Sequence, residues 1–323
     1  MKNIIFGIVF LSPPFLKKII LKWLCGAQFG CKSRIGWFSS ITGIRISLGD
    51  YSTVKPLTII RCNGDVRIGN YTEISSFSVI YGCANFQVGN RCYIGPQSWI
   101  NVSEDVVMGN GVGIGPRTMI FTHGSFLPYT EGYPVRFGKV TIGNNVWIAA
   151  GVFIHPGVDV GDNVFINSRS VIANNITLGQ VVEGFPAKEI CPIEKIRRPI
   201  TPAKRDTLII NILNHFASFL KQVYSKAKIS NHGSNAFSLH FHRKHYLIGF
   251  VNSKGAVPSE FLGNRHNQII ALANCKDWKP LSNKDKTTTF DFTSMKTSYT
   301  KDQLSRMLYL FLRQYYGIVF EFK

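Results

Sequence analysis

The sequence predicts a mainly β protein: a triangular solenoid of short parallel strands, with an amphipathic helix before it and an α+β module after it. Three observations support this fold class. Aliphatic residues recur every six positions, Gly-Asn or Gly-Asp pairs recur every 18 or 20 positions, and both rhythms stop near residue 192. We therefore divide the chain into residues 1–30, 31–192 and 193–323.

Residues 1–30 open with an apolar run that stops at Ser12-Pro13-Pro14. The run is too short for a membrane span, which takes about 20 residues. After the prolines, apolar residues at helical spacing alternate with lysines, which predicts a short basic amphipathic helix. Two roles stay open for it: a cap over the end of the solenoid, or a helix resting on a membrane surface. Its apolar positions are Phe15, Leu16, Ile19, Ile20, Trp23 and Leu24, and its lysines are Lys17, Lys18 and Lys22.

The six-residue period is clearest after residue 140. A helix repeats every 3.6 residues and a simple strand every two, so neither predicts a period of six. Six residues can form one short strand and one corner, and three such units close a coil of 18. Gly143-Asn144 and Gly161-Asp162 suit sharp corners. The residues expected to point inward are Ile142, Ile148, Ile154, Val160, Ile166, Ile172 and Leu178.

Upstream the coil length is 20, as the pairs from Gly49-Asp50 to Gly109-Asn110 show. The additional residues follow the third aliphatic position of each coil, so they all fall on one corner. Ile120 is the third aliphatic position of its coil, and the next position of the six-residue period is Ile142. The intervening segment 121–139 therefore leaves from that same corner. Its glycines and prolines favour an extended loop, and loops this long within compact folds are usually functional.

These features resemble the left-handed parallel β-helix acyltransferases, which are built on hexapeptide repeats. Phe121-Thr122-His123, followed by "VTIGNNVWI" from Val140 to Ile148, is similar to the sugar and antibiotic O-acetyltransferases, in which a Thr-His or Ser-His pair opens such a loop. The resemblance implies that His123 is the catalytic base. Imidazole suits this role because its ordinary pKa of about 6.5 lets it accept a hydroxyl proton near neutral pH. The repeat register places no cysteine near the loop, so we predict direct transfer in a ternary complex.

The acceptor side is predicted from the stacking of the coils. Asn101 should lie beneath Phe121 and near His123, where the family uses Asp or Asn to contact the sugar; a simple corner turn is the alternative. Tyr81 and Asn85, one coil further down, and Arg136 in the loop are further candidates for acceptor binding.

The donor side follows from the resemblance, which implies that residues 140–190 bind coenzyme A, with acetyl-CoA as acyl donor. Trp147 should point outward, either to flank the pantetheine arm or to pack at a subunit contact. Lys188 ends a "GFPAK" segment whose basic residue meets coenzyme phosphate in the family. The sequence departs from the family pattern at two positions: it has Asn174 where many relatives have lysine, and Cys191 where some have arginine. The other implied coenzyme positions are Ala149, Ala150, Ser168 and Ala173.

Residues 193–323 lack the period of six. A helix is predicted over 206–226, strands over 237–251, 267–275 and 287–295, and a last helix from a capping box at Thr300–Gln303 to about Tyr316. His240 and His242 alternate onto one strand face, but no third ligand stands at a convincing spacing, so we expect no metal. His155, after an inward isoleucine, is interpreted as structural.

Charge and cysteine content limit the partners. The net charge is +19, and residues 191–323 carry 21 Lys+Arg against 8 Asp+Glu, which favours anionic neighbours such as coenzyme phosphates, lipid headgroups or an acidic glycan. No nucleic-acid-binding signature occurs, so we expect no nucleic acid as partner. Seven cysteines without framework spacing favour a reducing compartment, the cytoplasm.

We therefore predict an acetyl-CoA-dependent O-acetyltransferase of a sugar hydroxyl in bacterial surface-polysaccharide assembly. It should form a homotrimer in the cytoplasm, with peripheral contact to the inner face of the membrane. Two alternatives stay open: an N-acetyltransferase of an amino-sugar nucleotide, and a non-catalytic scaffold that binds a partner through residues 193–323. A carbonic anhydrase of the same fold needs three zinc-binding histidines, and the repeat region offers only His123 and His155.

Overall fold

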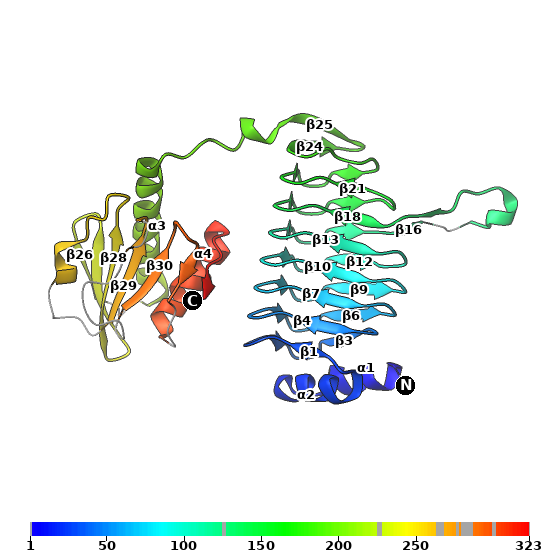
Figure 1. The fold of residues 1–323 in the computed structure, drawn as a ribbon, viewed down its shortest axis with the longest axis horizontal. Coiled ribbons are helices and arrows are strands. Elements are labelled where there is room, and N and C mark those ends of the chain that lie inside the picture. The colour runs from blue at the N-terminus through cyan, green and yellow to red at the C-terminus, as the bar shows by residue number, and fades with distance from the viewer. Residues whose placement is uncertain are drawn as a thin grey trace. The chain divides into compact units, whose positions relative to one another are not determined.

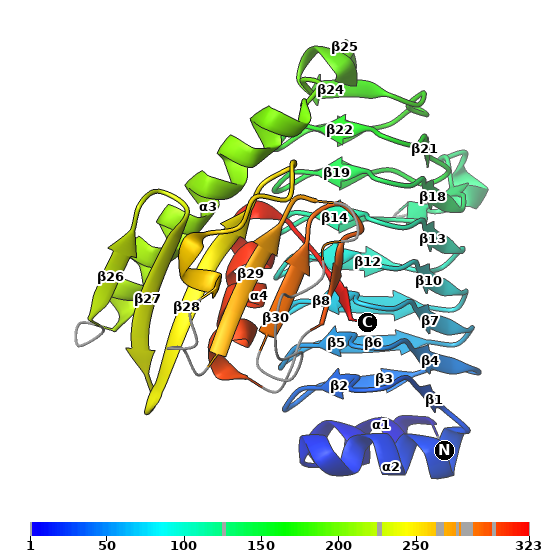
Figure 2. The ribbon, with the colours of Figure 1, turned by 60° about the vertical axis from the view of Figure 1, so that its left-hand side comes forward.

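A computed structural model of the chain describes residues 2–124, 127–224, 228–262, 268–275, 278, 287–298 and 302–322. The chain forms two compact units, residues 1–198 and 199–323, drawn in Figures 1 and 2.

The first unit is the predicted left-handed parallel β-helix, in which each coil adds one strand to each of three sheets. Sheet A contains β1 (Gln28–Phe29), β4 (Ile46–Leu48), β7 (Val66–Ile68), β10 (Phe86–Val88), β13 (Val106–Met108), β18 (Val140–Ile142) and β21 (Asp159–Val160). Sheet B contains β2 (Arg34–Ile35), β5 (Thr53–Val54), β8 (Glu73–Ile74), β11 (Tyr93–Ile94), β14 (Gly113–Ile114), β19 (Trp147–Ile148), β22 (Phe165–Ile166), β24 (Gln180–Gly184) and β25 (Ala187–Pro192). Sheet C contains β3 (Ser40–Thr42), β6 (Ile59–Cys62), β9 (Val79–Gly82), β12 (Trp99–Asn101), β15 (Met119–Ile120), β20 (Phe153–Ile154) and β23 (Val171–Ile172). We name the corners AB, BC and CA after the sheets that they join.

The strand register confirms the period. Ile94 lies between Ile74 and Ile114, each 20 positions away, and Ile148 pairs with Ile166, 18 positions away. All five side chains are almost completely buried in the axial core. Because burying one isoleucine side chain contributes about 1.5–3 kcal/mol, a continuous column of them stabilises the stack along its whole length.

The AB corner is held by a ladder of amide and carboxylate side chains. Asp50 N–H donates to Asn70 Oδ1 at 2.7 Å, and Asn70 N–H donates to Asn90 Oδ1 at 2.7 Å. The residue after each pair takes a left-handed conformation, as Tyr71 does with φ of 56°. The Gly-Asn and Gly-Asp pairs thus stand at a corner, as their spacing predicts.

The last inward position is predicted wrongly, because the side chain of Leu178 is 72% exposed. Ile176 makes the bridge to Val160 instead, 16 positions away, and is buried. The final coil is therefore two residues shorter than the ones below it. The chain then turns through Gly179, whose φ is 72°, into the antiparallel pair β24–β25 that ends the β-helix.

Two helices lie across the N-terminal end of the β-helix: α1 (Lys2–Leu11) and α2 (Pro14–Cys25) (Figures 1 and 2). Ile5, Val9 and Leu21 are buried and join the axial core. Of the two roles left open for this segment, the cap over the end of the β-helix is therefore seen in the structure. None of the described helices has the length and apolar character needed to cross a bilayer.

Lys17 corrects one expectation, because it does not face outward. Its side chain is completely buried, and its ammonium donates to the carbonyls of Val9 at 2.5 Å, Phe10 at 3.1 Å and Ser39 at 2.8 Å. Two of these carbonyls lie in the last turn of α1, where helical acceptors lack intrahelical donors and the helix dipole favours a cation. Burial lowers the pKa of Lys17 to about 8. The lysine fastens the cap to the first coil.

In the second unit, the described residues form one seven-stranded sheet with two helices on one face. Ile248, Leu272 and Phe290 face the helices, and Leu247 and Ala271 belong to a smaller cluster on the other face. In sheet order the strands are β26 (Ile229–His232), β27 (Ala236–Phe241), β28 (Lys244–Val251), β29 (Gln268–Ala273), β30 (Thr287–Asp291), β31 (Lys296–Thr297) and β32 (Glu321–Phe322), and the helices are α3 (Pro202–Val223) and α4 (Gln303–Tyr316).

Two predictions for this unit need correction. The strand predicted over 237–251 is a hairpin that turns at His242 and Arg243, whose φ angles are 44° and 64°. Left-handed turn positions usually hold Gly or Asn, so the sequence did not reveal the turn, and His242 leaves the strand face of His240. The cap of α4 is Asp302, which accepts from Ser305 N–H at 2.9 Å; Thr300 lies outside the described residues.

Candidate functional site

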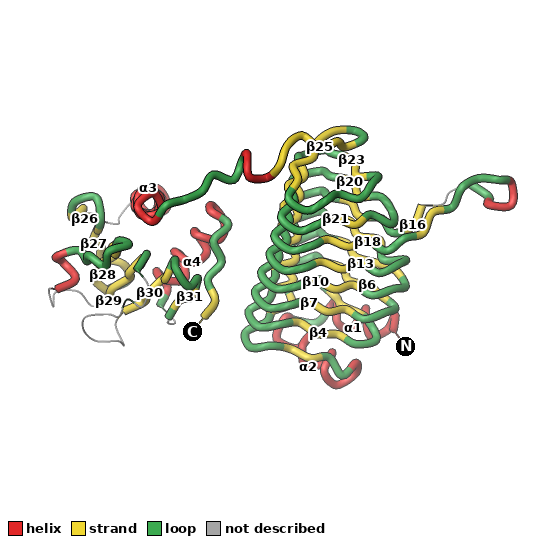
Figure 3. The backbone as a smooth tube through the Cα atoms, turned by 45° about the horizontal axis from the view of Figure 1, so that its top comes forward, coloured by secondary structure: helices red, strands yellow, loops and turns green. Residues whose placement is uncertain are grey.

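The long loop leaves the CA corner (Figure 3) one coil above Asn101, because β15, which precedes the loop, pairs with β12. Thr122, at its root, is fully buried. Its hydroxyl accepts from Glu104 N–H at 3.0 Å and lies within hydrogen-bond distance of the Asn101 backbone oxygen (3.1 Å) and Oδ1 (3.0 Å). These contacts fasten the loop to the coil below, immediately before His123.

His123 begins a short antiparallel ribbon, in which β16 (His123–Gly124) pairs with β17 (Arg136–Phe137). Its half-buried imidazole stacks on the Phe137 ring, with 4.4 Å between ring centroids. The root of the ribbon is also clamped to the coil above, because Gly138 N–H donates to the Thr122 carbonyl and Gly157 N–H to the Gly138 carbonyl. A Cβ on Gly138 would stand 2.5 Å from Gly157 Cα, so only glycine fits there. The histidine is thus held on a fixed, partly open support.

A second histidine belongs to the same corner. Phe121 N–H donates to the Ile154 carbonyl at 3.0 Å, which sets His155 one coil above Phe121. The Phe121 and Phe153 rings stack at 5.5 Å, and His155 meets Phe153 edge-on at 4.8 Å. Partial burial, and then the positive charge of Arg136, lower the pKa of His155. Our structural interpretation of His155 overlooked this cluster, although Phe121 and His155 each follow an inward isoleucine in the repeat register.

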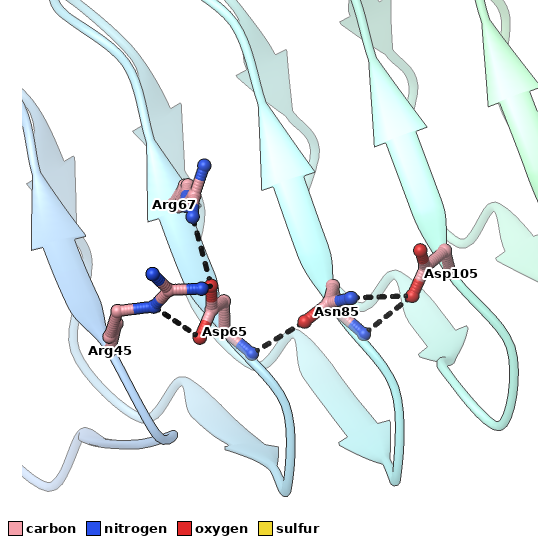
Figure 4. A network of polar contacts seen from close by, with 5 residues as sticks. All are labelled: Arg45, Asp65, Arg67, Asn85 and Asp105. Carbon is pink, nitrogen blue, oxygen red and sulfur yellow. Dashed lines mark hydrogen bonds and ion pairs between the residues drawn. The ribbon is translucent and has the colours of Figure 1, made fainter.

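Lower on the CA corner, the polar residues link one coil to the next (Figure 4). Asp65 N–H donates to Asn85 Oδ1 at 2.8 Å, and Asn85 donates to Asp105 Oδ1 from its backbone N–H and its Nδ2, both at 2.9 Å. Arg45, by its hydrogen bond and charge, and then Arg67 lower the pKa of Asp65. This network gives Asn85 a structural role, and its contact with an acceptor stays a prediction.

Asn101 and Tyr81 stand side by side on neighbouring strands of sheet C. Asn101 is buried, and its Oδ1 accepts from Ser103 N–H at 3.3 Å as well as contacting Thr122. The hydrogen bonds of Asn101 Oδ1 are therefore those of a residue that stabilises a corner turn, which was the alternative to acceptor binding. Tyr81 is half-buried and Arg136 is exposed.

The residues predicted for the donor side lie mostly elsewhere on the β-helix. Trp147 points outward from sheet B, 45% exposed, and its indole covers Gly113, where a Cβ would approach ring carbon Cε3 to 2.4 Å. Beside it opens a cavity of about 360 Å³. The residues lining this cavity are Asn145, Trp147, Asn163, Val164, Phe165, Ile193 and Arg197.

Ala149 and Ala150 follow sheet B at the BC corner, and Ser168 stands at that corner one coil higher. Lys188 is exposed on β25, opposite Glu183 of sheet B. Ala173 differs from the others because it follows β23 at the CA corner. A single chain thus holds His123 and most of the predicted donor residues on different corners of the prism.

Among the described residues, no group of three or more His, Cys, Asp or Glu side chains is arranged to hold a metal ion. None of the seven cysteines, all of which belong to the described part of the chain, forms a disulfide. In the second unit, His240 stacks on His245 with 4.4 Å between ring centroids.

Residues 139–174 match the family model described as Bacterial transferase hexapeptide (six repeats). A galactoside O-acetyltransferase of Escherichia coli (strain K12) is 45% identical over 51 residues, covering 16% of this chain and 25% of that protein. A chloramphenicol acetyltransferase of Morganella morganii is 40% identical over 55 residues, covering 17% and 26%. These matches thus span about a quarter of each curated relative.

Among solved structures, a mutant of the N-acyltransferase AntD from Bacillus cereus, in complex with dTDP-4-amino-4,6-dideoxyglucose and coenzyme A, has a TM-score of 0.42 and 19% identity. The alignment covers 64% of this chain and 99% of that chain. Within the β-helix, the residues that match the hexapeptide model run from β18 to just after β23.

Proposed function

We propose, from the hexapeptide repeat of bacterial transferases in its β-helix, that this chain is a coenzyme A-dependent acyltransferase. The single observation that carries the proposal is the placement of His123. It stands at the root of the one long loop of the CA corner, on a ribbon clamped to the coils below and above. A half-buried imidazole held in this way is suited to take a proton from an acceptor that enters the corner.

In the proposed reaction, His123 accepts the proton of an acceptor hydroxyl as the oxygen attacks the carbonyl carbon of the acetyl thioester. The new C–O bond forms, the C–S bond breaks, and the coenzyme leaves as a thiolate that recovers the proton from the imidazolium. General-base assistance of this kind contributes about 10²–10⁴ in rate. Holding both substrates in the corner supplies a further large part of the acceleration.

We propose that acetyl-CoA binds along sheet B and the BC corner. Trp147 offers an exposed indole face, and Ala149 and Ala150 add only short side chains to the neighbouring corner. Arg197, in the cavity beside Trp147, and Lys188 on β25 are the basic groups for the coenzyme phosphates. Arg197 is thereby our candidate to compensate for Asn174 and Cys191.

The separation of His123 from these residues supports a homotrimer. Three prisms with parallel axes can set the CA corner of one subunit against the donor surface of the next, and threefold symmetry then repeats this contact until every interface is used. The ribbon of β16 and β17 projects from its corner (Figure 3) and is suited to reach a neighbouring subunit.

For the acceptor we propose a sugar hydroxyl in bacterial surface-polysaccharide assembly, with the reaction on the cytoplasmic side of the membrane. Seven cysteines without the spacing of a disulfide framework fit a reducing compartment. The half-buried Tyr81 and the exposed Arg136 are the side chains that we assign to acceptor contact in this corner.

The test is an incubation of the full chain with labelled acetyl-CoA and a panel of sugars, nucleotide sugars and amino sugars, with His123→Ala as control. Label on a hydroxyl, lost in the control, supports the proposal. Label on an amine alone would replace it with N-acetylation, and a chain that neither binds coenzyme A nor transfers the label would favour the scaffold.

A further inference from the structure

We infer that the outer face of the α1–α2 hairpin is a docking surface for an anionic lipid bilayer. The hairpin has two apolar faces, and the core of the β-helix uses only one. Ile5 and Val9 of α1 and Leu21 of α2 point into the core. Away from the core, large apolar side chains recur at spacings of three and four residues, which aligns them along one exposed face of each helix. We call this set the outer stripe: Ile4 (68% exposed), Ile8 (46%), Leu11 (69%), Phe15 (73%), Ile19 (52%) and Trp23 (86%).

The placement of the hairpin makes the outer stripe accessible. Both helices lie flat across the end of the β-helix (Figures 1 and 2). Their free faces therefore point along the axis of the coils, away from the first coil. A cap alone needs only its inner face to be apolar, so the outer stripe requires a separate explanation.

The charge around the outer stripe selects the partner. The first 49 residues contain seven Lys or Arg and no Asp or Glu. Lys22 is exposed on α2, and Lys18, beside it in the helix, contacts the Ser33 carbonyl at 3.2 Å and lies over the Phe29 ring. An apolar stripe with a basic surround is complementary to a bilayer that contains anionic headgroups. Lys17 takes no part, because its ammonium is buried under α1.

A second copy of the chain is the competing occupant of this face. Its hairpin, in which residues 1–25 contain four lysines and no Asp or Glu, would bring the same positive charge against the first, which opposes end-to-end association. In the proposed homotrimer, by contrast, the three hairpins stand at the same end of parallel axes. Three stripes would then meet one bilayer together, and their combined binding would exceed that of a single stripe.

The test is flotation of the full chain with vesicles of phosphatidylcholine and phosphatidylserine, or of phosphatidylcholine alone. We expect binding to the anionic vesicles that weakens with salt without vanishing. The combined variant Phe15→Ser, Ile19→Ser, Trp23→Ser removes three exposed side chains and should lower the partition coefficient at least about tenfold. The matched control is Leu178→Ser, Phe185→Ser, Ile190→Ser, at the other end of the β-helix, where the exposed fractions are 72%, 82% and 59%. The partition coefficient of this control should stay within about twofold of the wild-type value.

Trp23 provides a second measurement that needs no multiple variant. In the wild type, brominated lipid should quench tryptophan fluorescence, and Trp23→Phe should remove most of that quenching. Several outcomes would overturn the inference: a wild type that does not float, an equal loss in both triple variants, or a hairpin variant whose light scattering reveals a smaller oligomer. Acyl transfer is measured separately in solution, so a chain that binds vesicles without transferring an acyl group overturns the proposed function and leaves this inference intact.

Discussion

The CA corner is built in two ways along the same β-helix. In the lower coils, Asp65, Asn85 and Asp105 direct their hydrogen bonds from coil to coil, and each corner stays short (Figure 4). Higher up, the chain leaves the corner as a ribbon, and His123 and His155 make ring contacts with Phe137 and Phe153. A polar side chain that is engaged in the ladder serves the fold, whereas one held on the ribbon is available for chemistry. Substitutions in the two parts should therefore separate stability from activity.

The largest effect is expected on the ribbon. His123→Ala should lower acyl transfer by about 10²–10⁴, because it removes the proposed general base. The thermal midpoint should change little, because the imidazole is half-buried and lies outside the core. Steady-state kinetics with the true acceptor and a thermal melt measure the two quantities. Near-normal turnover in a folded variant would remove His123 from the mechanism.

Thr122→Val tests the junction between the two parts. The variant keeps the side-chain volume but removes the oxygen that accepts from Glu104 N–H and contacts Asn101 in a buried site. Leaving a buried polar group unpaired costs about 1–3 kcal/mol of unfolding free energy. A small displacement of the adjacent His123 should also lower kcat by about 10- to 100-fold. Thr122→Ser keeps the hydroxyl and is the control; equal losses in both variants would show that the hydrogen bonds are not the cause.

Asn85→Ala should show the opposite pattern to His123→Ala. It removes two side-chain hydrogen bonds, to Asp65 N–H and Asp105 Oδ1, and should lower the unfolding free energy by about 1 kcal/mol. Transfer activity and the KM for the acceptor should stay close to the wild-type values. A KM that rises without loss of stability would return Asn85 to the acceptor site and break the comparison.

The sequence predicts regular features well and irregular ones poorly. The period of six predicted the coils and the corner from which the loop leaves, because each coil repeats the same burial and turn geometry. It failed at Leu178, where the last coil shortens, and at Lys17, whose burial depends on carbonyl groups of another helix. In the second unit, the turn at His242 and Arg243 carries no glycine or asparagine to announce it.

For the candidate site, the sequence predicted which residues lie near one another but not which contacts they make. The repeat register shows which residues share a corner, so Asn101 and Tyr81 were correctly expected on neighbouring strands. Register does not show which hydrogen bonds a side chain makes, and Asn85 therefore could not be recognised as part of the ladder. The contact of Phe137 with His123 depends on how the ribbon folds back, and no periodic pattern encodes that.

The smallest expected effect tests whether the charge of Arg136 acts on His155, so that the ribbon and the coil above it form one cluster. Arg136→Gln removes a positive charge that, after burial, lowers the pKa of His155. That pKa should rise only part of the way to its ordinary value, because burial, the larger cause, remains. The folded pKa lies below the ordinary value of about 6.5, so protonation destabilises the fold as the pH falls through that value, and the variant should reduce this loss. An NMR titration of the imidazole, assigned with His155→Asn, measures the shift. The control Arg117→Gln removes an exposed arginine on the BC corner and should leave the pKa of His155 unchanged. An unchanged or lower pKa in Arg136→Gln would place Arg136 away from His155 in solution, and the upper corner would then be two separate contacts instead of one cluster.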